Sequence, residues 1–193
     1  MRGRASGAGA EQLRLFVAFE LQGAQLDAVN RSIQALRAEF PRLRWVPREN
    51  QHVTVKFLGA THPGLSSWVE ERIAEVAFAH RPFHSSLTAL GAFPSPSRAR
   101  VLWAGLDDRA GRMAEIALAL DRALSAEFKP KIRVFSPHLT LARSDPPVRL
   151  PEGLASTVPE AEPIAIERIT LFRSRIQRPV ARYERLGDFP LVG

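Results

Sequence analysis

The chain has 193 residues, of which 45% are hydrophobic. That is enough to build one compact unit around a shared core. The formal net charge is +7 and the basic residues are spread along the sequence, which suits a polyanionic partner, although a solvated surface without nucleic acid explains the charge equally well. There is no cysteine. This excludes disulfides, thiolate catalysis and cysteine-ligated metal sites, and favours a reducing, cytoplasmic location.

The predicted elements follow the order strand, helix, strand, strand, and this order occurs twice. Apolar residues at intervals of three and four predict helices at 26–40, 65–76 and 113–124. Alternating or continuous apolar runs predict strands at 13–20, 52–59, 83–91, 98–106, 131–135, 138–143, 164–174 and 180–186, with a Pro-rich loop before the last two. We therefore expect an α+β fold with mainly antiparallel sheets.

The first twelve residues are small and polar, without an apolar stretch of the kind found in a secretory signal. We expect residues 1–12 to be disordered and residues 13–193 to form a single two-lobed domain. No apolar run reaches the length needed to span a bilayer, so no membrane association is expected.

A short motif that occurs twice is the most informative feature. His52-Val-Thr-Val and His138-Leu-Thr-Leu both read histidine, aliphatic, threonine, aliphatic, and they begin 86 residues apart. Side chains alternate faces along a strand, so His52 shares a face with Thr54, and His138 shares one with Thr140. Random placement of five histidines and six threonines predicts roughly 0.15 such triplets, so two matched copies indicate a functional pair. The alternative is a pair of solvent-facing strand histidines, which explains neither the duplication nor the spacing. The remaining histidines, His62, His80 and His84, lack this context and are read as surface residues.

Two histidines suit phosphodiester chemistry that needs no metal. Displacement at phosphorus sets the attacking and leaving oxygens in line, so one imidazole accepts a proton from water while the other donates one to the departing oxygen. Imidazole titrates near neutrality, which makes both protonation states available. The hydroxyls of Thr54 and Thr140 are placed to donate to the phosphate oxygens as negative charge develops.

The sequence resembles the two-histidine (2H) phosphoesterase superfamily, in its RNA 2',3'-cyclic phosphodiesterase branch, also called the 2'-5' RNA ligase family. The resemblance rests on the paired motifs and on the segments RLFVAFEL, WVPRENQHVTVKFLG, GAFPSPSRARVLWAGL, FSPHLTLAR and ITLFRSRIQRPVARYERL, which together extend over nearly all of residues 13 to 187. It implies a bilobal fold with two pseudo-symmetric sheets, outer helices and a central cleft. Val55 is a small departure, because leucine is more usual there.

The resemblance also implies an activity and the roles of individual residues. The implied reaction is hydrolysis of an RNA 2',3'-cyclic phosphate end to a 2'-phosphate, without a metal or nucleotide cofactor, with His52 as proton donor and His138 as proton acceptor. We expect the protein to be a monomer. Phe57 is implied as a substrate-binding residue and Arg143 as a phosphate-binding residue. Simple alternation puts both on the face opposite the histidines, so they reach the cleft only if the strands bulge or end there.

Other readings differ in reaction or in class. The same family is associated with 2'-5' ligation and its reversal on tRNA halves, and a related enzyme acting on another cyclic nucleotide is also compatible with the motifs. An RNA-binding module without catalysis would be expected to expose more aromatic residues on its strands. A metal-dependent hydrolase would be expected to add a carboxylate or a third histidine at ligand spacing. P-loop and nucleophile-elbow motifs are absent, which argues against an ATP-driven ligase and a serine hydrolase.

Overall fold

The computed structural model describes residues 11–21, 23–130, 134–175 and 181–193. Almost all of the segment expected to be disordered, 1–12, therefore lies outside the described residues. The strand expected at 131–135 also lies partly outside them, and Val134 and Phe135 belong to no strand.

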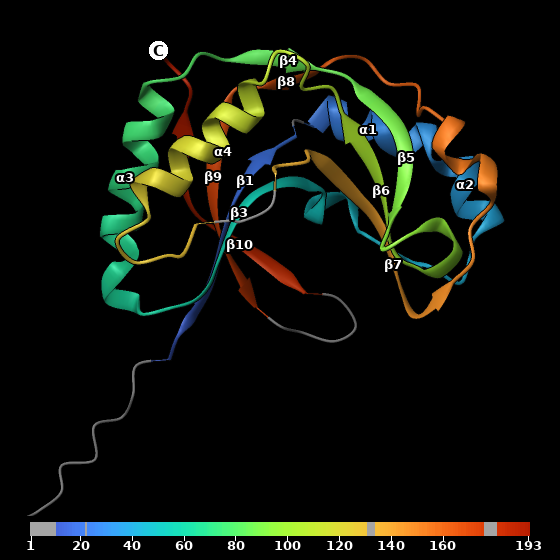
Figure 1. Ribbon diagram of the computed structural model, residues 1–193, viewed down its shortest axis with the longest axis horizontal. Coiled ribbons are helices and arrows are strands. Elements are labelled where there is room, and N and C mark those ends of the chain that lie inside the picture. The colour runs from blue at the N-terminus through green and yellow to red at the C-terminus, as the bar shows by residue number, and fades with distance from the viewer. Residues whose placement is uncertain (1–10, 22, 131–133, 176–180) are drawn as a thin grey trace, which may run out of the picture.

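The described chain contains ten strands, four α-helices and four short 3₁₀ turns (Figure 1). The helices are α1 (Gly23–Ser32), α2 (Gln34–Glu39), α3 (Ser66–Phe78) and α4 (Arg112–Ala123), and the turns are η1 (Arg48–Asn50), η2 (Pro63–Leu65), η3 (Pro96–Arg98) and η4 (Glu152–Ser156). The strands are β1 (Leu13–Glu20), β2 (Arg44–Trp45), β3 (His52–Thr61), β4 (Phe83–Ser85), β5 (Leu87–Phe93), β6 (Ala99–Leu106), β7 (His138–Val148), β8 (Ile164–Ile166), β9 (Arg168–Arg175) and β10 (Arg182–Pro190).

Eight strands form one curved sheet in the order β10-β9-β1-β3-β7-β6-β5, with β2 paired to β7, and β4 pairs with β8 in a small second sheet. Every pairing is antiparallel. The mixed, mainly antiparallel fold predicted from the sequence is confirmed. The two pseudo-symmetric sheets implied by the resemblance are joined into one, because β3 and β7 pair at Val53–Leu139.

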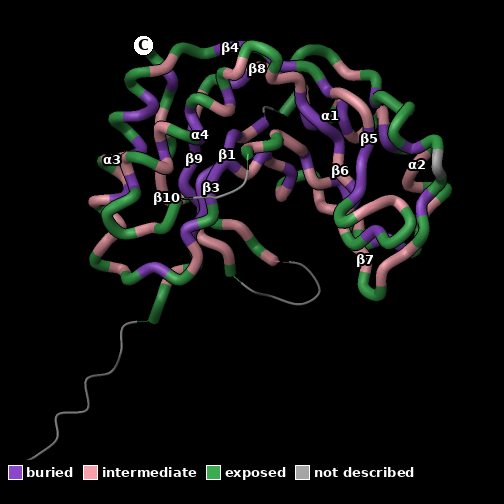
Figure 2. Tube along the Cα trace, in the orientation of Figure 1, coloured by how far each residue is buried: buried purple, intermediate pink, exposed green. Residues whose placement is uncertain are grey.

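The helices lie on the outer side of the sheet, and its other face is open toward the centre of the molecule (Figure 1). Alternate residues of β1 belong to the two different faces of the sheet. Leu15, Val17 and Phe19 join the main core under the helices. Phe16 and Ala18, on the opposite face, pack with Phe172 and Tyr183. Figure 2 shows the buried positions running through β1 and β9. Burial on both faces explains why the sequence of β1 is almost continuously apolar.

Three expected elements are each divided in the structure. The helix expected at 26–40 is interrupted at Ile33, which separates α1 from α2. The strand expected at 83–91 is divided at Ser86, where the chain leaves the small sheet for the large one, and the strand expected at 164–174 is divided at Glu167 in the same way. In both divided strands, one continuous apolar run supplies strands to two different sheets. Hydrophobic periodicity does not reveal where such a run changes sheet.

Candidate active site

The two motif histidines begin the two central strands. His52 is the first residue of β3 and His138 is the first residue of β7, and the strands meet one residue later at Val53–Leu139. Val53 and Leu139 are fully buried in the core. The histidines and the threonines two residues beyond them are half-buried and project from the other face. The structure therefore brings both motifs together around one point of the sheet.

Both imidazoles are anchored in the same way. Nδ1 of His52 lies 2.8 Å from the carbonyl oxygen of Asn50, and Nδ1 of His138 lies 2.8 Å from that of Ser136. A carbonyl oxygen only accepts, so Nδ1 is the donor in each ring and Nε2 is left for chemistry. Nε2 of His52 lies 3.0 Å from Oγ1 of Thr54, which donates to it when the ring is neutral. The equivalent residues of the two motifs thus share one orienting contact.

His52 lies among aromatic rings that keep water away from it. Its ring centroid is 4.9 Å from that of Phe16, 6.1 Å from that of Phe172 and 5.2 Å from that of Tyr183, with the Tyr183 ring edge-on. Burial lowers the pKa of His52 to about 4; the bond to the Asn50 carbonyl opposes this, and the charges of Arg143 and His138 add to it. In the ligand-free protein His52 is therefore neutral at pH 7.

His138 has a different aromatic neighbourhood in the other half of the sheet. Its ring is 5.2 Å from that of Phe93, edge-on, and 6.0 Å from that of Trp103. The Trp103 indole lies against Gly91, where a Cβ atom would come within 2.1 Å of the ring. A side chain at Gly91 would therefore displace the indole from beside His138.

A β-bulge at the last residue of each motif brings Phe57 and Arg143 to the site. In β3, Lys56 pairs with Val17 and Thr54 with Ala18, so Val55 is an extra residue opposite β1. In β7, Leu141 is the corresponding extra residue, because Ala142 pairs with Leu102 and Thr140 with Trp103. Two consecutive residues then face the core on each strand, all at most 1% exposed: Val55, Lys56, Leu141 and Ala142. The next residues, Phe57 and Arg143, return to the histidine face.

A pocket of about 110 Å³ opens on this face. Five of the residues singled out in the sequence line it: His52, Thr54, Phe57, Thr140 and Arg143. His138 is not among the lining residues. Phe57 is 65% exposed, which leaves its ring available to a ligand.

Other residues line the pocket without having been singled out in the sequence. These are Arg14, Leu15, Phe16, Val46, Asn50, Gly59, Ser174 and Tyr183. Phe16 is one of many apolar residues in β1, so its sequence context does not distinguish it from a core residue. Tyr183 and Ser174 come from β10 and β9, which are distant from the motifs in sequence and lie opposite each other in the sheet.

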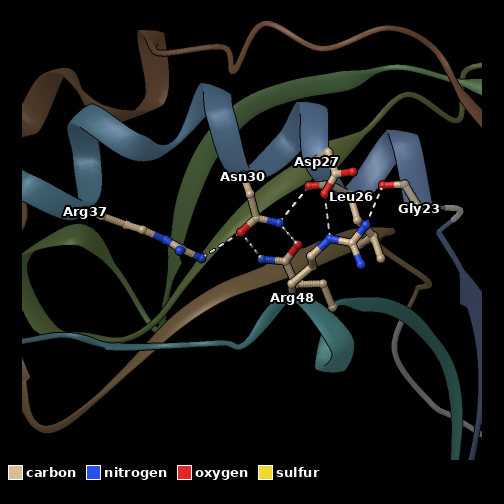
Figure 3. A network of polar contacts seen from close by, with 7 residues as sticks. Gly23, Leu26, Asp27, Asn30, Arg37 and Arg48 are labelled. Atoms are coloured by element: carbon tan, nitrogen blue, oxygen red, sulfur yellow. Dashed lines mark hydrogen bonds and ion pairs between the residues drawn. The ribbon is translucent and has the colours of Figure 1, made fainter.

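A polar network fixes the turn η1 (Figure 3). The last residue of this turn is Asn50, whose carbonyl accepts from His52. The amides of Asn30 and Gln51 contact each other reciprocally at 3.0 and 3.3 Å, and Arg37 donates to Asn30 Oδ1 at 2.8 Å. Arg48 donates to Asp27 at 2.6 Å and to the Gly23 carbonyl at 2.9 Å. Gln51 is only 2% exposed. Helix α1 therefore holds the segment that orients the first histidine.

No three His, Asp or Glu side chains in the described ranges gather closely enough to hold a metal ion. None of the helices in the described part of the chain has the length and apolar character needed to cross a membrane.

Comparison with solved structures shows that other proteins share this fold. The chain superimposes on the crystal structure of TT0787 of Thermus thermophilus with a TM-score of 0.80, at 24% identity, over 93% of this chain and 98% of that one. It superimposes on the crystal structure of E. coli LigT complexed with 3'-AMP with a TM-score of 0.76, at 24% identity, over 95% of this chain and all of that one. The likeness at this identity concerns the fold.

Sequence comparison gives the family. A Geobacillus stearothermophilus protein named RNA 2',3'-cyclic phosphodiesterase is 30% identical over 92% of this chain, which spans only 57% of that protein. A Methanothermobacter thermautotrophicus protein of the same name is 28% identical over 86% of this chain and 90% of its own length. The model of the family described as LigT like Phosphoesterase matches residues 25–103 and 106–183. The chain belongs to the LigT-like phosphoesterase family.

Proposed function

We propose that the protein hydrolyses RNA 2',3'-cyclic phosphate ends to 2'-phosphate ends, with His52 and His138 as its acid/base pair. The observation that carries the proposal is the pair of equivalently anchored histidines on β3 and β7, each with Nε2 directed away from its backbone contact. The relatives named RNA 2',3'-cyclic phosphodiesterase support the choice of substrate.

In the proposed reaction, water attacks phosphorus in line with the P–O3' bond. His138 Nε2 has no hydrogen-bond partner among the described residues, so its lone pair is available to accept the proton of the attacking water. His52 donates a proton from Nε2 to the departing O3', and the phosphate stays on O2'. The donor role needs a protonated His52. The entering phosphate anion would supply this by offsetting the burial and the Arg143 charge that lower the pKa of His52.

The side chains around the pocket fit the other requirements of this reaction. When His52 is protonated, Nε2 no longer accepts from Thr54, and the Thr54 hydroxyl is free to donate to a phosphate oxygen. Thr140 and Arg143 line the same pocket and supply a second hydroxyl and a positive charge. We assign these residues to phosphate binding and the exposed ring of Phe57 to contact with the nucleoside.

The test is incubation of the protein with a short RNA that ends in a 2',3'-cyclic phosphate, in EDTA and without ATP. We expect the product to carry a 2'-phosphate and a free 3'-hydroxyl. A 3'-phosphate product would show that O2' and not O3' is the leaving oxygen, and joined strands with a 2'-5' linkage would favour ligation as the reaction. Absence of turnover in EDTA that returns with a divalent metal would contradict the metal-free mechanism.

A further inference from the structure

Two arginines lie side by side on the histidine face, one from β2 and one from β7. The register between these strands pairs Arg44 with Arg143 and Trp45 with Ala142. Directly opposed residues of an antiparallel pair project to the same face. Trp45 packs on the core with Ala142, so Arg44 lies with Arg143 on the pocket side. Both arginines are exposed.

Strand β2 places Arg44 between the two halves of the sheet. Strand β7 pairs with β6 along one edge, through Leu102–Ala142 and Ala104–Leu139. Its other edge meets β3 at Leu139 and β2 at Ala142 and Arg143. Val46 and Asn50, which follow β2, line the pocket itself. Arg44 is therefore on the segment that forms the pocket wall, one strand away from Arg143.

This arrangement is electrostatically unfavourable without a ligand. Like charges directly opposite each other on neighbouring strands are destabilising. Other exposed arginines, such as Arg48, Arg100 and Arg109, have an aspartate oxygen at 2.6, 2.9 and 2.7 Å. Within the described residues, neither Arg44 nor Arg143 has a carboxylate partner. Two guanidinium groups without a carboxylate partner, one lining the pocket and one opposite it on the neighbouring strand, are suited to more than one phosphate.

We propose that Arg44 is a second phosphate-binding residue, which holds the phosphate joining the terminal nucleotide to the rest of the RNA. The inference rests on the function proposed above. Arg143 meets the single negative charge of the cyclic phosphate beside the histidines. The charge of Arg44, one strand further out, is matched by the next phosphate of the chain, which an RNA strand has and a mononucleotide lacks. Arg44 therefore selects RNA ends over free cyclic mononucleotides.

The experiment compares two substrates: adenosine 2',3'-cyclic phosphate and the dinucleotide ApA ending in the same cyclic phosphate. The readout is the ratio of kcat/KM for the dinucleotide to kcat/KM for the mononucleotide. We expect Arg44→Gln to lower this ratio about tenfold, as loss of one charged hydrogen-bonding contact does. The slope of log(kcat/KM) against log salt for the dinucleotide should become shallower by about 0.7. Arg44→Lys keeps the charge and should recover most of the ratio.

Arg42→Gln is the matched control, because Arg42 is also exposed but lies in the turn before β2. Its ratio should equal that of the unchanged protein. Equal ratios in the Arg44→Gln and unchanged proteins would overturn the inference, and so would an equal loss in Arg42→Gln, which would indicate a general charge effect. If the unchanged protein hydrolyses neither substrate, the proposed function fails. The same variants are then compared for binding to a labelled RNA ending in a 2'-phosphate, where equal affinities for Arg44→Gln and the unchanged protein would overturn the assignment of Arg44.

Discussion

Val53 of β3 lies directly opposite Leu139 of β7, and each is the residue immediately after a motif histidine. This pair joins the two halves of the sheet and so sets the relative position of His52 and His138. Both side chains are fully buried in the main core. The distance between the two imidazoles is therefore tied to packing on the far side of the sheet.

Leu139→Ala should reduce both stability and turnover. Removing a fully buried leucine costs about 2–5 kcal/mol of the free energy of unfolding, and here the cavity forms under the contact between the two halves. Leu124→Ala is the control, because Leu124 is also fully buried but follows α4 and belongs to neither motif strand. We expect similar losses in denaturant unfolding, but a larger fall in kcat for Leu139→Ala. Equal kcat values in the two variants would show that this pair does not set the catalytic geometry.

Asn30→Leu should lower kcat by about tenfold without unfolding the protein. Asn30 connects α1 to Gln51 beside the turn that presents the Asn50 carbonyl to His52, and its loss frees His52 to change ring orientation. The effect should appear in kcat more than in KM, with a shifted pH-rate profile. Glu75→Gln is the comparison, because it weakens an ion pair with Arg72 on α3, outside the network around η1. Equal kcat values for both variants would show that Asn30 does not position His52.

The first bulge places one residue of a buried ion pair on the core side of β3. Lys56 is 1% exposed and its ammonium donates to Asp121 of α4 on the core side, which leaves Phe57 to face the pocket. Asp121→Ala should destabilise the fold by about 3–5 kcal/mol, because it leaves a buried charge unpaired. The double variant Lys56→Met, Asp121→Leu should recover most of that loss. An Asp121→Ala protein with unchanged thermal stability would show that the ion pair does not stabilise the fold.

His52 should titrate far below an ordinary histidine. NMR of the imidazole should give a midpoint near pH 4 in the free protein, since burial lowers the pKa of His52 to about 4 from 6.5. The native pKa lies below the unfolded value, so the unfolded state binds the proton first as pH falls from 6.5 to 4. His52 should therefore reduce stability over this range, by roughly 3 kcal/mol at its lower end. Addition of adenosine 2'-monophosphate should raise the midpoint. A free midpoint near 6.5, or one that the nucleotide leaves unchanged, would contradict the proposed charge compensation.

The sequence predicts the residues of the site better than it predicts their geometry. His52, Thr54, His138 and Thr140 follow from a repeated motif and strand alternation, and the structure gathers them. Alternation fails at the residues after each motif, because the bulges at Val55 and Leu141 leave no signal in residue type. The bulge that brings Phe57 to the pocket also turns Lys56 toward the core, where its ammonium donates to Asp121, 65 residues away in sequence.

Long-range strand pairing limits the sequence reasoning in the same way. Phe16, Tyr183 and Arg44 reach the site through strands that pair across the chain, and none belongs to a local pattern. Tyr183 is beside His52 because β10 and β9 continue the sheet beyond β1. The pairing of Arg44 with Arg143 is likewise a property of register, which one sequence does not specify for a two-residue strand.

The most direct measurement is the single-turnover rate of cyclic phosphate hydrolysis by His52→Ala, His138→Ala and the double variant, with folding of each confirmed by circular dichroism. An acid and a base that act on one phosphate work as a unit. The single-turnover rate of each single variant should therefore fall about 10³- to 10⁴-fold, and that of the double variant little further. Rates for His138→Ala or His52→Ala close to that of the unchanged protein would contradict the two-histidine mechanism.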